Sequence, residues 1–203
     1  MTKEWILKFW EEQHKTSNLK NLSGYNGKTV WKELKIEDRI KQGNKVLNIG
    51  VGFGYCTKDL FDKGMIVTAL DIVPNALEKV KEWTERTYLD NQIQDLPPDT
   101  YNLAISHLVA QHMNTEDLTR QMTNVIRSIK DDGLFAIQFS EYIKPTTLIN
   151  NETYIDGLGL QFCRHISDMD IIIRKSGGKV KNIFLIDDYP KFNIRWYGVH
   201  ITK

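Results

Sequence analysis

Three glycines at alternate positions mark the stretch of this chain best suited to hold a ligand. Gly50, Gly52 and Gly54 follow an apolar run at residues 46–49 and precede a helical pattern that begins near Thr57. Glycine permits positive φ and lets a ligand approach the backbone closely. A helix N-terminus adds free N–H groups and a positive dipole end. The stretch therefore predicts a loop that cradles the polar end of a ligand.

The spacing of the glycines distinguishes this loop from two other ligand-binding loops. The dinucleotide fingerprint needs G-x-G-x-x-G, whereas the chain has G-x-G-x-G, and a P-loop would need a following Gly-Lys-Ser/Thr, which is absent. Asp71 ends the next apolar run, about 20 residues further on, where a carboxylate can accept hydrogen bonds from ribose hydroxyls. The third glycine is out of place for NAD, but a ribose remains a suitable partner for Asp71.

Residues 46–54 (VLNIGVGFG) and 67–77 (VTALDIVPNAL) resemble motifs I and II of the class I S-adenosylmethionine-dependent methyltransferases. Residues 101–106 are similar to the fourth strand of that family, with Asn102 in place of the usual aspartate, and residues 107–113 to the segment after it. The resemblance covers residues 44–203. It implies S-adenosyl-L-methionine as cofactor and methyl transfer as the reaction.

The resemblance also assigns cofactor contacts. In the family an aspartate commonly ends the third strand and holds the adenine amino group; alignment on the following Leu-Pro places Gln92 there, with Ile93 as its neighbour, while Asp90 or Asp95 could serve instead. N-terminal additions often close over the site in this family, which makes Tyr25 a possible contact. The predicted cofactor-binding residues are Asn48, Gly50, Gly52, Gly54, Asp71, Ile72, Gln92, Ile93, Ser106 and Tyr25.

Three residues are candidates for catalysis. The methyl group of a sulfonium is already activated, so the protein must mainly align the acceptor, and a hydroxyl acceptor also gains from a histidine base. His107 follows the strand at residues 101–106, at the edge where open α/β sheets bind ligands, and is the predicted base; a packing role between strand and helix is the alternative. Glu141 follows the strand at 134–140, and His112 occupies a position where the family often has a histidine that steadies the turn.

The apolar patterns predict the elements that position these residues. A short turn joins the last two strands, which must therefore be antiparallel. Asp131-Asp132-Gly133 is expected to be a turn. The order predicts a doubly wound α/β fold, with a mostly parallel seven-stranded sheet, a C-terminal antiparallel hairpin and helices on both faces. The expected strands are residues 45–49, 66–70, 87–92, 101–106, 134–140, 179–186 and 192–202, and the expected helices between them are residues 57–63, 75–86, 117–129 and 169–175.

The length of 203 residues predicts a single methyltransferase domain. Within it we expect an N-terminal helical lid at 1–43, a cofactor-binding core at 44–142, a polar insertion at 143–163 and a C-terminal helix with strands at 164–203. Apolar residues at helical spacing near Trp10 fit either packing on the domain or a lid over the cleft. Arg164 could bind an anionic substrate group, although exposure at the surface is the favoured expectation.

The composition of the chain limits the kinds of partner expected for this protein. The net charge of +1 favours neither nucleic acid nor a membrane surface, and no signal peptide or membrane-spanning run is present, so a cytoplasmic location is expected. Cys56 and Cys163 lack metal-ligand spacing, and no metal is predicted. We expect a monomer or homodimer that methylates a small molecule, with a hydroxyl of a saccharide or natural product favoured; the alternatives are a small amine, or a regulatory subunit that binds the cofactor without catalysis.

Overall fold

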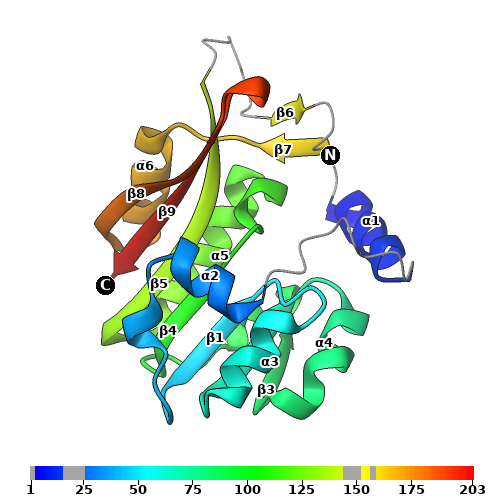
Figure 1. Ribbon diagram of the computed structural model, residues 1–203, viewed down its shortest axis with the longest axis vertical. Coiled ribbons are helices and arrows are strands. Elements are labelled where there is room, and N and C mark those ends of the chain that lie inside the picture. The colour runs from blue at the N-terminus through cyan, green and yellow to red at the C-terminus, as the bar shows by residue number, and fades with distance from the viewer. Residues whose placement is uncertain (1–2, 16–25, 144–151, 156–158) are drawn as a thin grey trace.

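The computed structural model describes residues 3–15, 26–143, 152–155 and 159–203. Its centre is a seven-stranded sheet with the order β3-β2-β1-β4-β5-β9-β8 (Figure 1). The strands from β3 to β5 are parallel, and β9 runs antiparallel to both β5 and β8, which confirms the predicted fold class. The strands are β1 (Lys45–Ile49), β2 (Ile66–Asp71), β3 (Arg86–Leu89), β4 (Tyr101–Ser106), β5 (Ile129–Tyr142), β8 (Lys179–Tyr189) and β9 (Ile194–Thr202).

Helices cover both faces of this sheet. One face packs against α2, α3 and α4, and the other against α5 and α6. Among the described residues, no helix has both the length and the apolar character needed to cross a membrane. The α-helices are α1 (Lys3–Lys15), α2 (Gly27–Glu33), α3 (Tyr55–Asp62), α4 (Pro74–Val80), α5 (Thr115–Ser128) and α6 (Ile166–Lys175), and the 3-10 helices are η2 (Glu37–Arg39), η3 (Lys81–Trp83), η4 (Asp90–Asp95), η5 (Ala110–His112) and η6 (Pro190–Phe192).

The central strands are apolar on both sides because both sides are buried. In β1, Leu47 and Ile49 join the core under α5 and α6, whereas Val46 joins the core under α2 and α3. A parallel strand covered by helices on both faces reads as a continuous apolar run, as the sequence of β1 does. Consequently the polar groups of these strands are concentrated at their ends.

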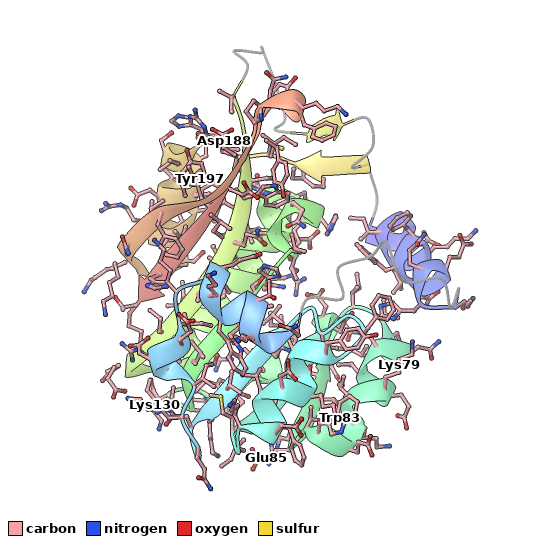
Figure 2. The ribbon with its side chains drawn as sticks, viewed as in Figure 1. Lys79, Trp83, Glu85, Lys130, Asp188 and Tyr197 are labelled. Carbon is pink, nitrogen blue, oxygen red and sulfur yellow. The ribbon has the colours of Figure 1, made fainter. Side chains whose placement is uncertain are left out.

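Polar contacts at the amino ends of the strands are structural. The Oδ1 atom of Asn102 accepts hydrogen bonds from the Lys45 N–H at 3.0 Å and from the Lys130 Nζ at 3.3 Å. Figure 2 shows Lys130 at this end of the sheet, far from Asp188 and Tyr197 on β8 and β9. The asparagine that replaces the usual aspartate of the family thus joins the start of β1 to β4 and β5.

The structure corrects several expected boundaries. Strand β5 begins at Ile129, before the turn predicted at residues 131–133, and its pairing with β4 is irregular at these residues: Tyr101 pairs with Ile129 and Leu103 with Leu134. Strand β3 ends at Leu89, and η4 follows where the strand was expected to continue. The helix expected over 75–86 ends at Val80 and becomes η3.

The polar insertion also contains regular structure. Strands β6 (Glu152–Ile155) and β7 (Gly159–Phe162) pair as a separate antiparallel sheet of two strands. In Figure 1 they lie beyond the carboxyl ends of the central strands, on the same side of the molecule as α1. The insertion is therefore placed near the edge of the sheet at which ligands bind in open α/β folds.

Candidate active site

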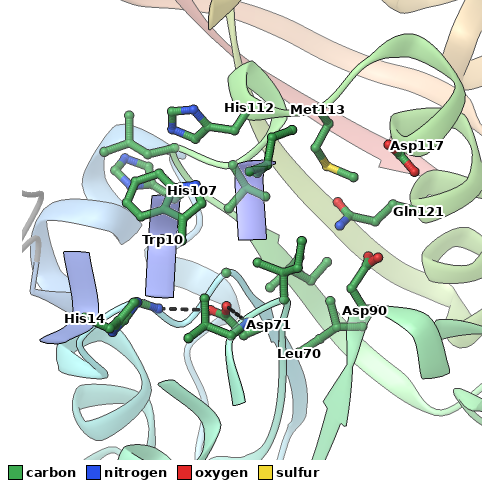
Figure 3. Close-up of a pocket in the computed structure, with 18 of the residues that line it drawn as sticks. Trp10, His14, Leu70, Asp71, Asp90, His107, His112, Met113, Asp117 and Gln121 are labelled. Carbon is green, nitrogen blue, oxygen red and sulfur yellow. Dashed lines mark hydrogen bonds between the residues drawn. The ribbon is translucent and has the colours of Figure 1, made fainter. Parts of the chain in front are cut away.

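A cavity of about 140 Å³ lies at the carboxyl ends of the parallel strands (Figure 3). Its walls come from the glycine loop after β1, the end of β2, the start of η4, the turn after β4 and the first half of α5. Helix α1 supplies Ile6, Trp10 and His14. A crevice at this edge is where the topology of a doubly wound sheet places a ligand.

The three glycines of the loop differ in the atoms that surround them. All have positive φ, at +69° for Gly50, +54° for Gly52 and +85° for Gly54. A Cβ at Gly50 would clash with Val109, and one at Gly54 would clash with Val80, so packing excludes larger residues at both positions. A Cβ at Gly52 would meet no atom within 4 Å. Gly52 lines the cavity, and the space beside it is where a ligand can contact the backbone.

Asp71 is held beside this loop. Its Oδ1 accepts a hydrogen bond from the Val73 N–H at 2.9 Å, and its Oδ2 accepts one from the Gly52 N–H at 3.3 Å. Burial raises the pKa of the carboxyl to about 6, against the opposing effect of these backbone hydrogen bonds. The ionised carboxylate is therefore poorly solvated. Hydrogen bonds donated by the hydroxyl groups of a ligand would stabilise this ionised form.

The residues predicted to contact adenine after β3 differ in whether they line the cavity. Gln92 is exposed and does not line the cavity; its Oε1 accepts a hydrogen bond from the Leu89 N–H at 2.9 Å. Ile93 is fully buried in the core. Asp90, left open by the sequence as an alternative, lines the cavity instead, because β3 ends early and Asp90 is the first residue beyond it.

The other predicted cofactor residues are divided between the cavity wall and the core. Ile72 lines the main cavity, while Asn48 lines an adjoining one of about 60 Å³ and donates a hydrogen bond to Thr57 Oγ1 at 2.9 Å. Ser106 is buried behind both, with no hydrogen-bond partner for its hydroxyl oxygen among the described residues. The prediction for Tyr25 lies outside the described residues.

His107 lines both the main and the adjoining cavity, and it has a carboxylate partner. Its Nε2 lies 2.6 Å from Oε2 of Glu33, the last residue of α2. A carboxylate at hydrogen-bond distance fixes the orientation of an imidazole ring. The pair can therefore act as an oriented acid–base group at the cavity wall.

Two buried side chains fix the turn that carries His107. The N–H of Leu108, which has a φ of +57°, donates to Gln138 Oε1 at 3.0 Å. Arg164 donates to the carbonyl oxygens of Ala110 and Met113, which lie on either side of His112. The expected exposure of Arg164 is wrong, because it is only 1% exposed, and burial lowers its pKa to about 10.

The remaining catalytic candidates differ in position. His112 lines the cavity, where burial lowers its pKa to about 4, and its ring meets the Trp10 ring edge-on with centroids 5.0 Å apart. Glu141 is buried at the end of β5 and does not line the cavity; its Oε1 lies 3.5 Å from His165 Nε2. Of the three candidates, the structure brings only His107 and His112 to the cavity.

Helix α1 both packs on the domain and walls the cavity. Leu7 and Trp10 pack against the apolar cluster of α4, as expected for a helix that packs on the domain. Trp10 also lines the cavity together with His14, whose ring lies 4.8 Å from that of Phe53. The two interpretations of the N-terminal pattern are therefore compatible, since one helix does both.

Sequence reasoning missed several residues of the site. No local signal marked Glu33, which is one acidic residue in a short amphipathic stretch. The exposed-looking Asp117 and Arg120 and the nearby Gln121 stood on a helix whose apolar face alone was interpreted. Helical spacing could have found the last group, because Asp117 and Gln121 are four residues apart and share one face.

The residues present fit a nucleoside cofactor. Gly52 leaves space against the backbone, Asp71 offers a buried acceptor, and the Oε1 of Gln121 is buried in the cavity wall with no hydrogen-bond partner among the described residues. Leu70 and Met113 add apolar surface on which a flat ring can pack. Polar groups at both ends of an apolar cavity suit a ribose beside Asp71 and a base beside Asp90.

Comparison with known proteins agrees with this arrangement. A methyltransferase domain family matches residues 47–137. The chain is 28% identical over 141 residues to an uncharacterized methyltransferase of Synechocystis, covering 65% of this chain and 66% of that protein. It is 26% identical over 137 residues to the malonyl-[acyl-carrier protein] O-methyltransferase of Acetivibrio thermocellus, covering 62% of this chain and 47% of that protein. The chain thus spans just under two thirds and about half of the lengths of these two relatives.

Solved structures share the fold. A SAM-dependent methyltransferase of Leishmania major superimposes with a TM-score of 0.69 at 16% identity, covering 98% of this chain and 82% of that one. At this identity the likeness concerns the fold alone. The methyltransferase domain match over residues 47–137 and the fold shared with a SAM-dependent methyltransferase support the predicted resemblance to the class I S-adenosylmethionine-dependent methyltransferases, whose cofactor is S-adenosyl-L-methionine.

Proposed function

We propose that this protein transfers the methyl group of S-adenosylmethionine to a small-molecule acceptor, favouring a hydroxyl of a saccharide or natural product. The observation that carries the proposal is His107, which lines the same cavity as Gly52 and Asp71 and is paired with Glu33 outside that lining. A hydroxyl must lose its proton as it is methylated, and an oriented histidine can receive that proton. The relative from Acetivibrio thermocellus, named an O-methyltransferase, supports an oxygen acceptor.

Three groups are proposed to hold the cofactor. Asp71 accepts hydrogen bonds from the ribose hydroxyls, Gly52 allows contact with the backbone, and Asp90 accepts from the adenine amino group. The ion pair of Asp90 with Arg120, at 2.7 Å, keeps its carboxylate oriented. When bound, S-adenosylmethionine supplies a methyl group that needs no further activation.

The acceptor side is proposed to use His107. The imidazole of His107, oriented by Glu33 through its Nε2 atom, is proposed to receive the proton of the acceptor. Glu33 keeps the ring in one orientation, as the partner of the base does in other base–carboxylate pairs. His112 is a weaker base because its pKa is about 4, and we assign it to packing against Trp10.

The test is an acceptor screen that measures release of S-adenosylhomocysteine. Saccharides, phenolic and other hydroxylated natural products and small amines are each supplied with S-adenosylmethionine, with wild-type protein and the His107→Ala variant in parallel. Turnover on a hydroxyl acceptor that is lost in the variant is the expected result. Turnover restricted to amines would make the protein an N-methyltransferase. Cofactor binding without turnover on any class of acceptor would favour a regulatory subunit.

A further inference from the structure

One end of the cavity contains a glutamine whose amide oxygen has no partner. Gln121 of α5 is 2% exposed and lines the cavity, and its Oε1 is buried without a hydrogen bond in the described part of the chain. Figure 3 shows its amide between Asp90 and Asp117, directed into the cavity. A buried amide oxygen without a donor is unfavourable unless a ligand or water supplies one.

The neighbours of Gln121 are already paired with one another. Arg120 Nη2 lies 2.7 Å from Asp90 Oδ2 and 3.6 Å from Asp117 Oδ1, and Arg120 Nη1 donates to the Asp90 carbonyl oxygen at 3.2 Å. This network fixes the two carboxylates and partly offsets their charge. The Gln121 amide stands beside the network, and its Oε1 accepts no hydrogen bond from the described residues.

Apolar groups at the same end leave room for a flat ring. Leu70 and Met113 lie near Gln121 and Asp90, whereas Trp10 and His14 lie toward the other end, with Asp71 between (Figure 3). A ribose held by Asp71 would therefore place its base among Leu70, Met113 and the two polar side chains. The base would present its edge to the amide of Gln121.

We propose that Gln121 recognises the edge of the adenine ring and makes the site specific for adenine; this inference rests on the proposed function. An amide offers an acceptor and a donor side by side, which match the amino group and an adjacent ring nitrogen of adenine. Asp90, a carboxylate, can only accept. In a purine whose amino group is replaced by a carbonyl, that oxygen would face the carboxylate of Asp90, which cannot donate, and the amide of Gln121 would have to turn over to donate to it.

The experiment compares two probes, S-adenosylhomocysteine and its deaminated counterpart S-inosylhomocysteine. Dissociation constants are measured by calorimetry for wild type, Gln121→Met and Gln111→Met. Methionine keeps the length of glutamine without its hydrogen-bonding groups. Gln111 is the matched control, because it is 3% exposed and its Oε1 also lacks a partner, but it does not line the cavity.

Wild type should prefer the adenine compound, and Gln121→Met should reduce that preference by on the order of tenfold or more. The affinity of Gln121→Met for S-adenosylhomocysteine should fall, whereas its affinity for the deaminated compound should change only a few-fold. Gln111→Met should keep the wild-type preference. Gln121→Asn, which keeps an amide but withdraws it by one methylene, should act in the same direction and serves if the methionine variant does not fold.

Two results would overturn the inference. An unchanged preference in a folded Gln121 variant, or an equal loss of both probes, would show that the amide does not recognise adenine. Failure of the wild-type protein to bind S-adenosylhomocysteine is a separate outcome, because it would overturn the proposed function itself and this inference with it.

Discussion

Protonation of Asp71 should control cofactor affinity between about pH 5 and pH 7. Burial raises the pKa of this carboxyl from its ordinary 3.8 to about 6. Because folding raises the pKa, the stabilising contribution of the carboxyl is complete below about pH 3.8 and is lost as the pH rises through about 6. The difference corresponds to about 3 kcal/mol of instability in the unliganded protein at neutral pH.

Ligand binding should reverse this penalty. Ribose hydroxyls donate to the ionised carboxylate and stabilise it, so the cofactor should bind the ionised form more tightly. If binding requires that form, a group with a pKa of about 6 makes the affinity about tenfold lower at pH 5 than at pH 7. Binding near pH 6 should release a fraction of a proton for the same reason.

The assay is calorimetric titration with S-adenosylhomocysteine across this range, for wild type and Asp71→Asn. The asparagine keeps the size of the side chain but does not titrate. At pH 7 it should bind about 1.5–3 kcal/mol more weakly, because hydrogen bonds to a charged acceptor are lost. Its affinity should be nearly constant down to pH 5, and its unliganded form should lose less stability than wild type as the pH rises.

The difference between the two proteins isolates Asp71, because all other titrating groups are common to both. A wild-type affinity that does not change with pH would refute the argument. An equal slope in Asp71→Asn would assign the pH dependence to another group, and unchanged affinity of that variant at pH 7 would remove Asp71 from the ribose site.

Three further variants test other parts of the site. Gly52→Val places a branched side chain in the space beside the loop and should abolish S-adenosylhomocysteine binding with an unchanged circular dichroism spectrum; wild-type affinity would exclude the loop as the site. His107→Ala should lower turnover by about 10²–10⁴ with little change in cofactor affinity, and Glu33→Gln should lower it less; near-full turnover in both would make the pair structural. Arg164→Met leaves buried carbonyls unpaired and should lower the free energy of unfolding by about 3 kcal/mol in urea titrations, whereas the same change at exposed Arg174 should have much less effect; equal effects would contradict the assigned role.

Local and periodic features of the sequence were sufficient for the fold. The glycine spacing, the carboxylate at Asp71 and the apolar runs of the central strands each depend on a few neighbouring residues, and the structure has the predicted seven-stranded arrangement. Errors concerned the ends of elements. Strand β5 begins at Ile129, ahead of the turn-like Asp131-Asp132-Gly133, and its pairing with β4 is irregular at these residues.

The sequence by itself therefore determined the class of fold, the glycine loop after the first strand and the carboxylate at the end of the second, because these signals are short-range. Only the tertiary structure decided which side chains share the cavity. Glu33 and His107 are 74 positions apart, Asp90 and Arg120 are 30 apart, and Arg164 reaches back 54 positions to the Ala110 carbonyl. Such contacts form because each helix crosses between strands and its buried face brings distant residues together. The composition and periodicity of the sequence do not predict them.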